Sequence, residues 1–123
     1  MLIDDPQTHA EVTAAFAAYE RALVENDVAM LDDLFWRDER TIRYGGGEVL
    51  YGYDAIAAFR AARAPAGGRS LEGTVITTYG RDFATASTLF RRSGAPDKLG
   101  RQMQTWVRLP EGWRVVAAHV SLI

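Results

Sequence analysis

The second half of the chain constrains the fold most, because it contains four long stretches with the pattern of β-strands and none with that of a helix. These stretches are rich in β-branched and aromatic residues and cover residues 71–79, 83–92, 101–109 and 113–122. The segments between them are short or polar and contain glycine. Consecutive strands on such connections pair as antiparallel neighbours. The sequence therefore predicts an antiparallel meander of four strands.

The first half of the chain predicts three helices. An apolar stripe at helical spacing starts at Val12, includes Tyr19 and ends at an Asn-Asp pair, which predicts a helix beginning near Thr8. Its start has the Thr-x-x-Glu pattern of a capping box, which satisfies free amide groups of the first turn. Two shorter helices are expected to be capped by Asp27 and Asp54.

Two short strands are predicted between the second and third helices. Residues 40–44 alternate in polarity and residues 48–51 return as a second strand, with three glycines forming the turn between them. The element order predicts an α+β domain over residues 1–123, with three helices against one face of a curved antiparallel sheet. A sheet of this shape encloses a cone whose wide end commonly holds a ligand.

Composition excludes several classes of function. The chain has 123 residues, no cysteine, two histidines and a net charge of −2. Thiolate chemistry and cysteine-built metal sites are therefore excluded, and we expect no metal and no cofactor. The charge provides no field for nucleic acid or an anionic membrane, and no long apolar run or signal peptide is apparent. We expect a cytoplasmic protein whose partners are small molecules or proteins.

Tyr19 and Arg43 are polar residues at positions where a core would use apolar ones. Arg43 lies on a short strand beside the expected sheet interior, where an inward guanidinium needs an anion or a ligand. It can instead point outward or pair with a local carboxylate such as Glu48. Tyr19 lies on the buried stripe of the first helix, so its hydroxyl needs a hydrogen-bond partner. That partner can be a ligand or simply a backbone carbonyl.

Polar residues also occur on the long strands. Gln102, Gln104 and Trp106 alternate onto one face, where they can line a polar pocket, lie on the outer face or form a dimer contact. Alternation places His119 on the same side as Trp113, as a base, an anion donor or a core histidine.

Arg60 and Arg63 lie one helical turn apart on the third predicted helix. Charged residues at this spacing usually form a solvated helix face. We interpret this pair in the same way.

Two segments of the chain resemble the small NTF2-like proteins of the AtzH and HpxZ type. The first runs from the Leu-Phe-Trp motif at residues 34–36 through Arg-Thr-Ile-Arg-Tyr-Gly at 40–45 to Arg63. The second includes Arg-Gln-Met-Gln-Thr-Trp-Val at 101–107 and Gly-Trp-Arg-Val-Val-Ala-Ala-His-Val-Ser at 112–121. The resemblance covers nearly the whole chain and implies the NTF2-like, cystatin-like cone.

The resemblance also implies an activity. Members of the AtzH branch remove carbon dioxide from 1,3-dicarboxyurea to give allophanate without a metal or organic cofactor. Their catalytic tyrosine and arginine correspond to Tyr19 and Arg43, and Gln104, Trp106 and His119 are candidates for substrate binding. The alternative is a non-catalytic module that binds a small anion or assists an amidohydrolase, as the HpxZ branch suggests. We also expect a homodimer joined through the open faces of the sheets, because the long strands carry aromatic residues on both faces.

Overall fold

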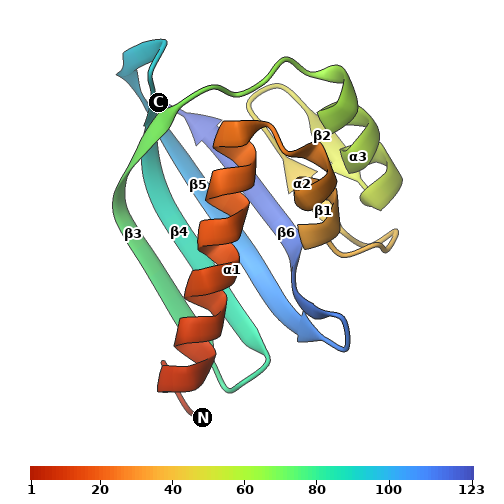
Figure 1. Ribbon diagram of the computed structural model, residues 1–123, viewed down its shortest axis with the longest axis vertical. Coiled ribbons are helices and arrows are strands. Elements are labelled where there is room, and N and C mark those ends of the chain that lie inside the picture. The colour runs from red at the N-terminus through yellow and green to blue at the C-terminus, as the bar shows by residue number, and fades with distance from the viewer.

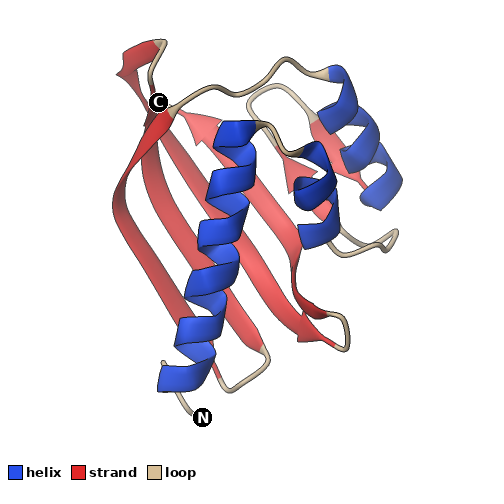
Figure 2. Ribbon diagram, viewed as in Figure 1, coloured by secondary structure: helices blue, strands red, loops and turns tan.

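The computed structural model describes residues 1–123 as three helices and six strands (Figure 2). The helices are α1 (Pro6–Glu25), α2 (Val28–Leu34) and α3 (Tyr53–Ala62). The strands are β1 (Ile42–Tyr44), β2 (Val49–Tyr51), β3 (Arg69–Tyr79), β4 (Phe83–Arg92), β5 (Ala95–Leu109) and β6 (Gly112–Leu122). All six strands belong to one curved sheet with the order β2-β1-β6-β5-β4-β3. The predicted α+β class and helix number are confirmed.

The predicted antiparallel meander is present as β3 to β6. The strand pair β1 and β2 joins it through β1, which runs parallel to β6 in the register Arg43↔Ala118. The sheet is therefore antiparallel except at this one junction. Because β1 and β6 are distant in the sequence, no local pattern indicated that they pair. This junction places Arg43 beside the meander and so brings the two halves of the chain together.

All three helices lie on one face of the sheet (Figure 1). α1 crosses the meander, and α2 and α3 cover the end of the sheet formed by β1, β2 and β6. The core between these layers contains Val12 from α1, Leu31 from α2, Ile56 from α3 and Trp106 from β5. None of the helices is both long and apolar enough to cross a membrane.

The helix starts differ from the predicted caps. Asp5 caps α1 through its carboxylate, which accepts from the backbone N–H of Thr8 at 3.2 Å, while Pro6 occupies the first turn. The predicted capping box at Thr8 is therefore wrong, because a proline in the first turn is favourable and Asp5 supplies the acceptor. Asp27 caps α2 as predicted, whereas Asp54 lies within the first turn of α3.

A bulge in β6 changes which side chains face the helices. Trp106 pairs with Val115 and Thr105 pairs with Ala117, so Val116 is an extra residue in the ladder. An extra residue shifts the alternation by one, and every later side chain points to the opposite face. Val115 is accordingly buried under the helices, whereas His119 is exposed.

The face of the sheet opposite the helices remains uncovered and carries apolar side chains. Tyr44, Phe83 and Met103 are exposed there, and Met103 is 58% exposed. An open depression of about 360 Å³ lies between β1, β4, β5 and β6 and is lined in part by Tyr44, Met103 and His119. An apolar surface of this kind is typical of a protein contact.

We expect this open face to join two copies of the chain. Sedimentation at micromolar concentration should give twice the chain mass of 13.6 kDa. Met103→Glu places a charge at the expected interface and should produce a monomer, whereas Arg81→Gln at the β3–β4 turn should not. A parent protein that sediments as a monomer would contradict this prediction.

Candidate functional site

Arg43 points into the space between the sheet and the helices. The residue is 8% exposed, and its Nη1 donates to Glu48 Oε1 at 2.7 Å. Its guanidinium lies 5.5 Å from the ring centroid of Phe59 on α3. Both sequence interpretations therefore apply, because Arg43 faces inward and also pairs with Glu48. Its Nε and Nη2 have no protein partner and are not sealed from solvent, so one side of the guanidinium fork remains free to bind an anion.

The turn between β1 and β2 holds Glu48 against Arg43. The backbone N–H of Gly47 donates to Glu48 Oε2 at 3.2 Å. Burial alone would raise the pKa of Glu48, but the hydrogen bonds from Arg43 and Gly47 and the charges of Arg43 and Arg63 lower it below its ordinary value. A Cβ at Gly45 would lie 1.7 Å from Glu48 Oε1. A larger residue at position 45 would therefore displace the Glu48 side chain. The prediction of a glycine turn between the two strands did not indicate this steric requirement.

Tyr19 is almost completely buried on the inner face of α1. The residue is 6% exposed, and its ring lies 6.2 Å from that of Phe35 at a tilt of 46°. Its hydroxyl makes no hydrogen bond to the protein, yet it is not among the polar atoms sealed from solvent. The alternative of a hydroxyl bound to a backbone carbonyl is therefore wrong. The open hydroxyl is available as a donor to a ligand.

Arg60 belongs to the core, so the predicted solvated face is wrong for this residue. Arg60 is 4% exposed, its Nη1 lies 2.5 Å from Asp32 Oδ1, and its guanidinium lies 4.6 Å from the Phe35 ring centroid. The same Phe35 ring packs against Tyr19. A guanidinium can be buried in this way when a carboxylate and an aromatic face replace its hydration.

Arg63 ends α3 and lies half-buried near Arg43 and Tyr19. Its guanidinium is 5.9 Å from the Phe59 ring centroid. Burial is the main cause that lowers the pKa of Arg63, and the positive charges of Arg43 and Arg60 lower it further. Tyr19 and Glu48 act on this pKa in the opposite direction. Arg63 shares the Phe59 ring with Arg43, which pairs with Glu48, so these three groups are neighbours, while Tyr19 and Arg60 share the Phe35 ring.

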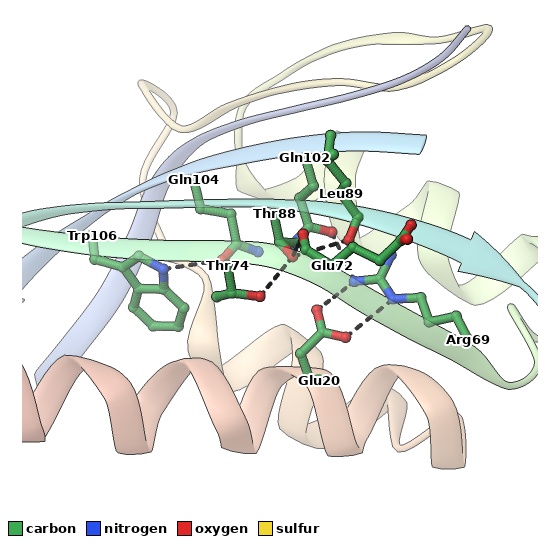
Figure 3. Close-up of polar contacts among 9 residues, drawn as sticks. All are labelled: Glu20, Arg69, Glu72, Thr74, Thr88, Leu89, Gln102, Gln104 and Trp106. Carbon is green, nitrogen blue, oxygen red and sulfur yellow. Dashed lines mark hydrogen bonds and ion pairs between the residues drawn. The ribbon is translucent and has the colours of Figure 1, made fainter. Parts of the chain in front are cut away.

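Gln104 and Trp106 are buried on the inner face of β5. Trp106 Nε1 donates to Gln104 Oε1 at 3.0 Å, and the Gln104 amide nitrogen has no partner. Figure 3 shows both side chains in the layer between the sheet and α1. Of the alternatives considered for this face, the outer-face and dimer-contact positions are excluded for these two residues.

A second polar cluster lies beside them. Arg69 on β3 binds both carboxylate oxygens of Glu20 on α1, and its Nη2 donates to Gln102 Oε1 at 2.9 Å (Figure 3). The Arg69 guanidinium also lies 4.5 Å from the Phe90 ring centroid. Because its donors are directed to these partners, we interpret Arg69 as a structural link between α1 and the sheet.

His119 does not lie on the same side of the sheet as Trp113, Gln104 and Trp106, so its predicted placement beside Trp113 is wrong. Its ring lies on the opposite face of the sheet, 6.0 Å edge-to-face from Tyr44. The cause is the bulge at Val116 described above, which reverses the alternation before His119.

The site formed by Tyr19, Arg43, Glu48, Arg60 and Arg63 has the chemistry of an anion site. It combines three guanidinium groups with a tyrosine hydroxyl. Glu48 pairs with Arg43 and Asp32 pairs with Arg60, so Arg63 is the guanidinium of this site that has no carboxylate partner. No group of three or more histidine, aspartate or glutamate side chains is arranged to hold a metal ion. Sequence reasoning identified Tyr19 and Arg43 but missed that Arg60 on α3 and Arg63 at its C-terminal end belong with them. The only available signal was that Arg60 and Arg63 fall on the same side as Ile56 and Phe59.

Comparisons with known proteins agree with this fold. The family described as AtzH-like matches residues 1–123. A crystal structure of a protein of unknown function from the DUF3225 family, from Pectobacterium atrosepticum, is 62% identical, with a TM-score of 0.95 over 98% of this chain and 94% of that one. No curated protein matches the chain.

Two further solved structures define the fold. A cystatin-like fold protein from Burkholderia xenovorans is 53% identical, with a TM-score of 0.96 over 100% of this chain and 97% of that one. An NTF2-like protein from Pseudomonas putida is 15% identical, with a TM-score of 0.81 over 94% of this chain and 86% of that one, and so supports the fold alone. The chain therefore has the NTF2-like, cystatin-like fold and belongs to the AtzH-like family.

Proposed function

We propose that the protein is a cofactor-independent carboxy-lyase that converts 1,3-dicarboxyurea to allophanate. The observation that carries this proposal is that an inward arginine with free donors and a tyrosine hydroxyl without a protein partner both lie buried near Arg63. The arginine binds a carboxylate of the substrate. The tyrosine hydroxyl donates a hydrogen bond to the nitrogen on which negative charge develops when carbon dioxide leaves. Membership of the AtzH-like family supports the same activity.

The reaction breaks one bond between a carboxylate carbon and a urea nitrogen. The bonding electrons remain on the nitrogen, carbon dioxide departs, and the nitrogen takes up one proton. We assign that proton to the Tyr19 hydroxyl, which regains a proton from water after each turnover. Arg43 holds and orients the carboxylated urea next to Tyr19 through its free N–H groups. The second carboxylate remains in the product.

Gln104 is assigned to the urea carbonyl oxygen. Trp106 binds the Gln104 side-chain oxygen, which leaves the amide N–H groups as the free end of the side chain. These N–H groups are buried and have no partner. A substrate that enters the space between the sheet and α1 would give them one, its carbonyl oxygen, where charge delocalised from the departing carboxylate collects. Trp106 is therefore a positioning residue for Gln104. We do not extend a substrate role to His119, which lies on the other face of the sheet.

The decisive experiment follows carbon dioxide release from freshly generated 1,3-dicarboxyurea with the purified protein. The expected result is release faster than the spontaneous rate and accompanied by allophanate. Because allophanate keeps an amide bond, an amidohydrolase is the expected functional partner downstream. Release at the spontaneous rate, combined with measurable binding of a small dicarboxylate, would replace the enzyme with a non-catalytic anion-binding module.

Replacement of Arg43 by lysine tests how the carboxylate is held. Arg43→Lys keeps the positive charge but loses the planar fork, so kcat/KM for 1,3-dicarboxyurea should fall roughly tenfold or more. Arg91→Lys is the matched control, because Arg91 pairs with Glu72 far from this site in a largely exposed contact. An Arg43→Lys protein with the parent kcat/KM would show that charge alone is sufficient.

A further inference from the structure

Arg63 differs from every other arginine in the protein. The remaining arginines either have a carboxylate within 4.0 Å or are exposed to solvent. Arg63 is half-buried and has no such carboxylate. A guanidinium that loses part of its hydration without gaining an anion is unfavourable for the folded protein. An arrangement of this kind is expected where the anion is a ligand.

The position of Arg63 relates it directly to Arg43. The two guanidinium groups lie on one aromatic side chain, at 5.9 Å and 5.5 Å from the Phe59 ring centroid. Glu48 neutralises only one of these two cations, through Arg43. Arg60 adds no further free cation, because Asp32 pairs with it. A ligand with two carboxylates can therefore engage both guanidinium groups at once, through the free side of Arg43 and the whole of Arg63.

We propose that Arg63 selects dianionic ligands by binding a second carboxylate, while Arg43 binds the first. This inference rests on the proposed function and assigns to Arg63 the carboxylate that stays in the product. That carboxylate keeps its charge throughout the reaction. An interaction with it is equally strong in the ground state and the transition state, so it contributes to binding and not to the rate of the chemical step.

The test uses glutarate, a stable dicarboxylate with a three-atom bridge like that of 1,3-dicarboxyurea, and its monomethyl ester, which has one carboxylate. Calorimetric titration of the parent protein should show at least tenfold tighter binding of glutarate than of the ester. In Arg63→Gln this preference should fall to about twofold or less. Arg63→Lys should restore part of it, because lysine supplies the charge without the fork. Arg81→Gln, which removes one exposed charge at the β3–β4 turn, should leave the preference unchanged.

Two further measurements separate ligand binding from a structural role. Arg63→Gln should raise KM for 1,3-dicarboxyurea at least tenfold and change kcat less than threefold. Its melting temperature should stay the same or rise, because the substitution removes a half-buried cation that has no carboxylate partner and lies beside another cation. A lower melting temperature together with an unchanged dianion preference would assign Arg63 to the fold and overturn the inference.

The inference and the proposed function fail in different ways. A protein that releases no carbon dioxide but loses its dianion preference in Arg63→Gln refutes the activity and retains the role of Arg63. A protein that decarboxylates 1,3-dicarboxyurea but keeps the same dianion preference in Arg63→Gln refutes the role of Arg63. Failure of the parent protein to bind glutarate at millimolar concentration also refutes it.

Discussion

Replacing Tyr19 with phenylalanine should lower kcat for 1,3-dicarboxyurea by roughly 100-fold, about 3 kcal/mol of transition-state stabilisation. The substitution removes only the hydroxyl, which we assign to the nitrogen that loses its carboxylate. KM should stay close to the parent value, because Arg43 and the rest of the site are unchanged. The fold should be unaffected, since the Tyr19 hydroxyl makes no hydrogen bond to the protein and its ring still packs against Phe35.

Tyr53→Phe is the matched control for this prediction. The Tyr53 hydroxyl donates to the backbone carbonyl of Asp32 at 3.0 Å, so its removal should cost about 1 kcal/mol of unfolding free energy with little effect on kcat. The two variants should thus show opposite patterns in thermal melts and in rate assays. A Tyr19→Phe protein with the parent kcat would remove Tyr19 from the mechanism.

Local sequence patterns were sufficient to predict most of the fold. The helical spacing of Val12 and Tyr19 reflects contact with one face of a sheet, and the meander follows from strand-like stretches joined by short connections. The parallel pairing of β1 with β6 could not be predicted in this way. It depends on how separate parts of the chain pack, and no neighbouring residues encode it.

The wrong prediction of the side of the sheet on which His119 lies has a definite physical cause. Simple alternation along β6 assumes an uninterrupted ladder, and one extra residue at Val116 is enough to reverse the later side chains. No glycine or proline marks this position in the sequence. Simple alternation therefore describes β6 up to Val115 and fails after Val116.

Arg60 and Arg63 show why part of the site was not predicted. A charged residue on a helix is usually solvated, so the spacing of Arg60 and Arg63 favoured an exposed face. Their burial depends on partners from other elements, with Asp32 on α2 for Arg60 and Phe59 beneath Arg63. Arg43 was easier to identify because alternation along the predicted strand of residues 40–44 separates it from Ile42 and Tyr44, and an inward arginine there needs an anion or a ligand. The sequence alone could not show whether Arg43 would bind a ligand anion, a carboxylate of the chain or both.

Asp32→Asn should cause a large loss of stability, about 3 kcal/mol in denaturant unfolding. Arg60 is buried, its Nε already lacks a hydrogen-bond partner, and Asp32 supplies the only carboxylate that binds it. An asparagine would leave that charge without compensation beneath the Phe35 ring. Replacing Arg60 should cost less unfolding free energy than replacing Asp32. The Asp32 side chain is 25% exposed, so water can hydrate its carboxylate when Arg60 is absent.

The double variant tests this asymmetry between the two partners. Arg60→Met in the Asp32→Asn background removes the stranded charge and fills similar space, so it should recover most of the lost unfolding free energy. Arg60→Met alone should cost about 1 kcal/mol or less, because the aliphatic part of the side chain is replaced and Asp32 stays hydrated. If Asp32→Asn instead unfolds at the parent denaturant concentration, Arg60 does not depend on Asp32. The Phe35 ring, which packs against Tyr19, would then be held in place by apolar contacts and not by this ion pair.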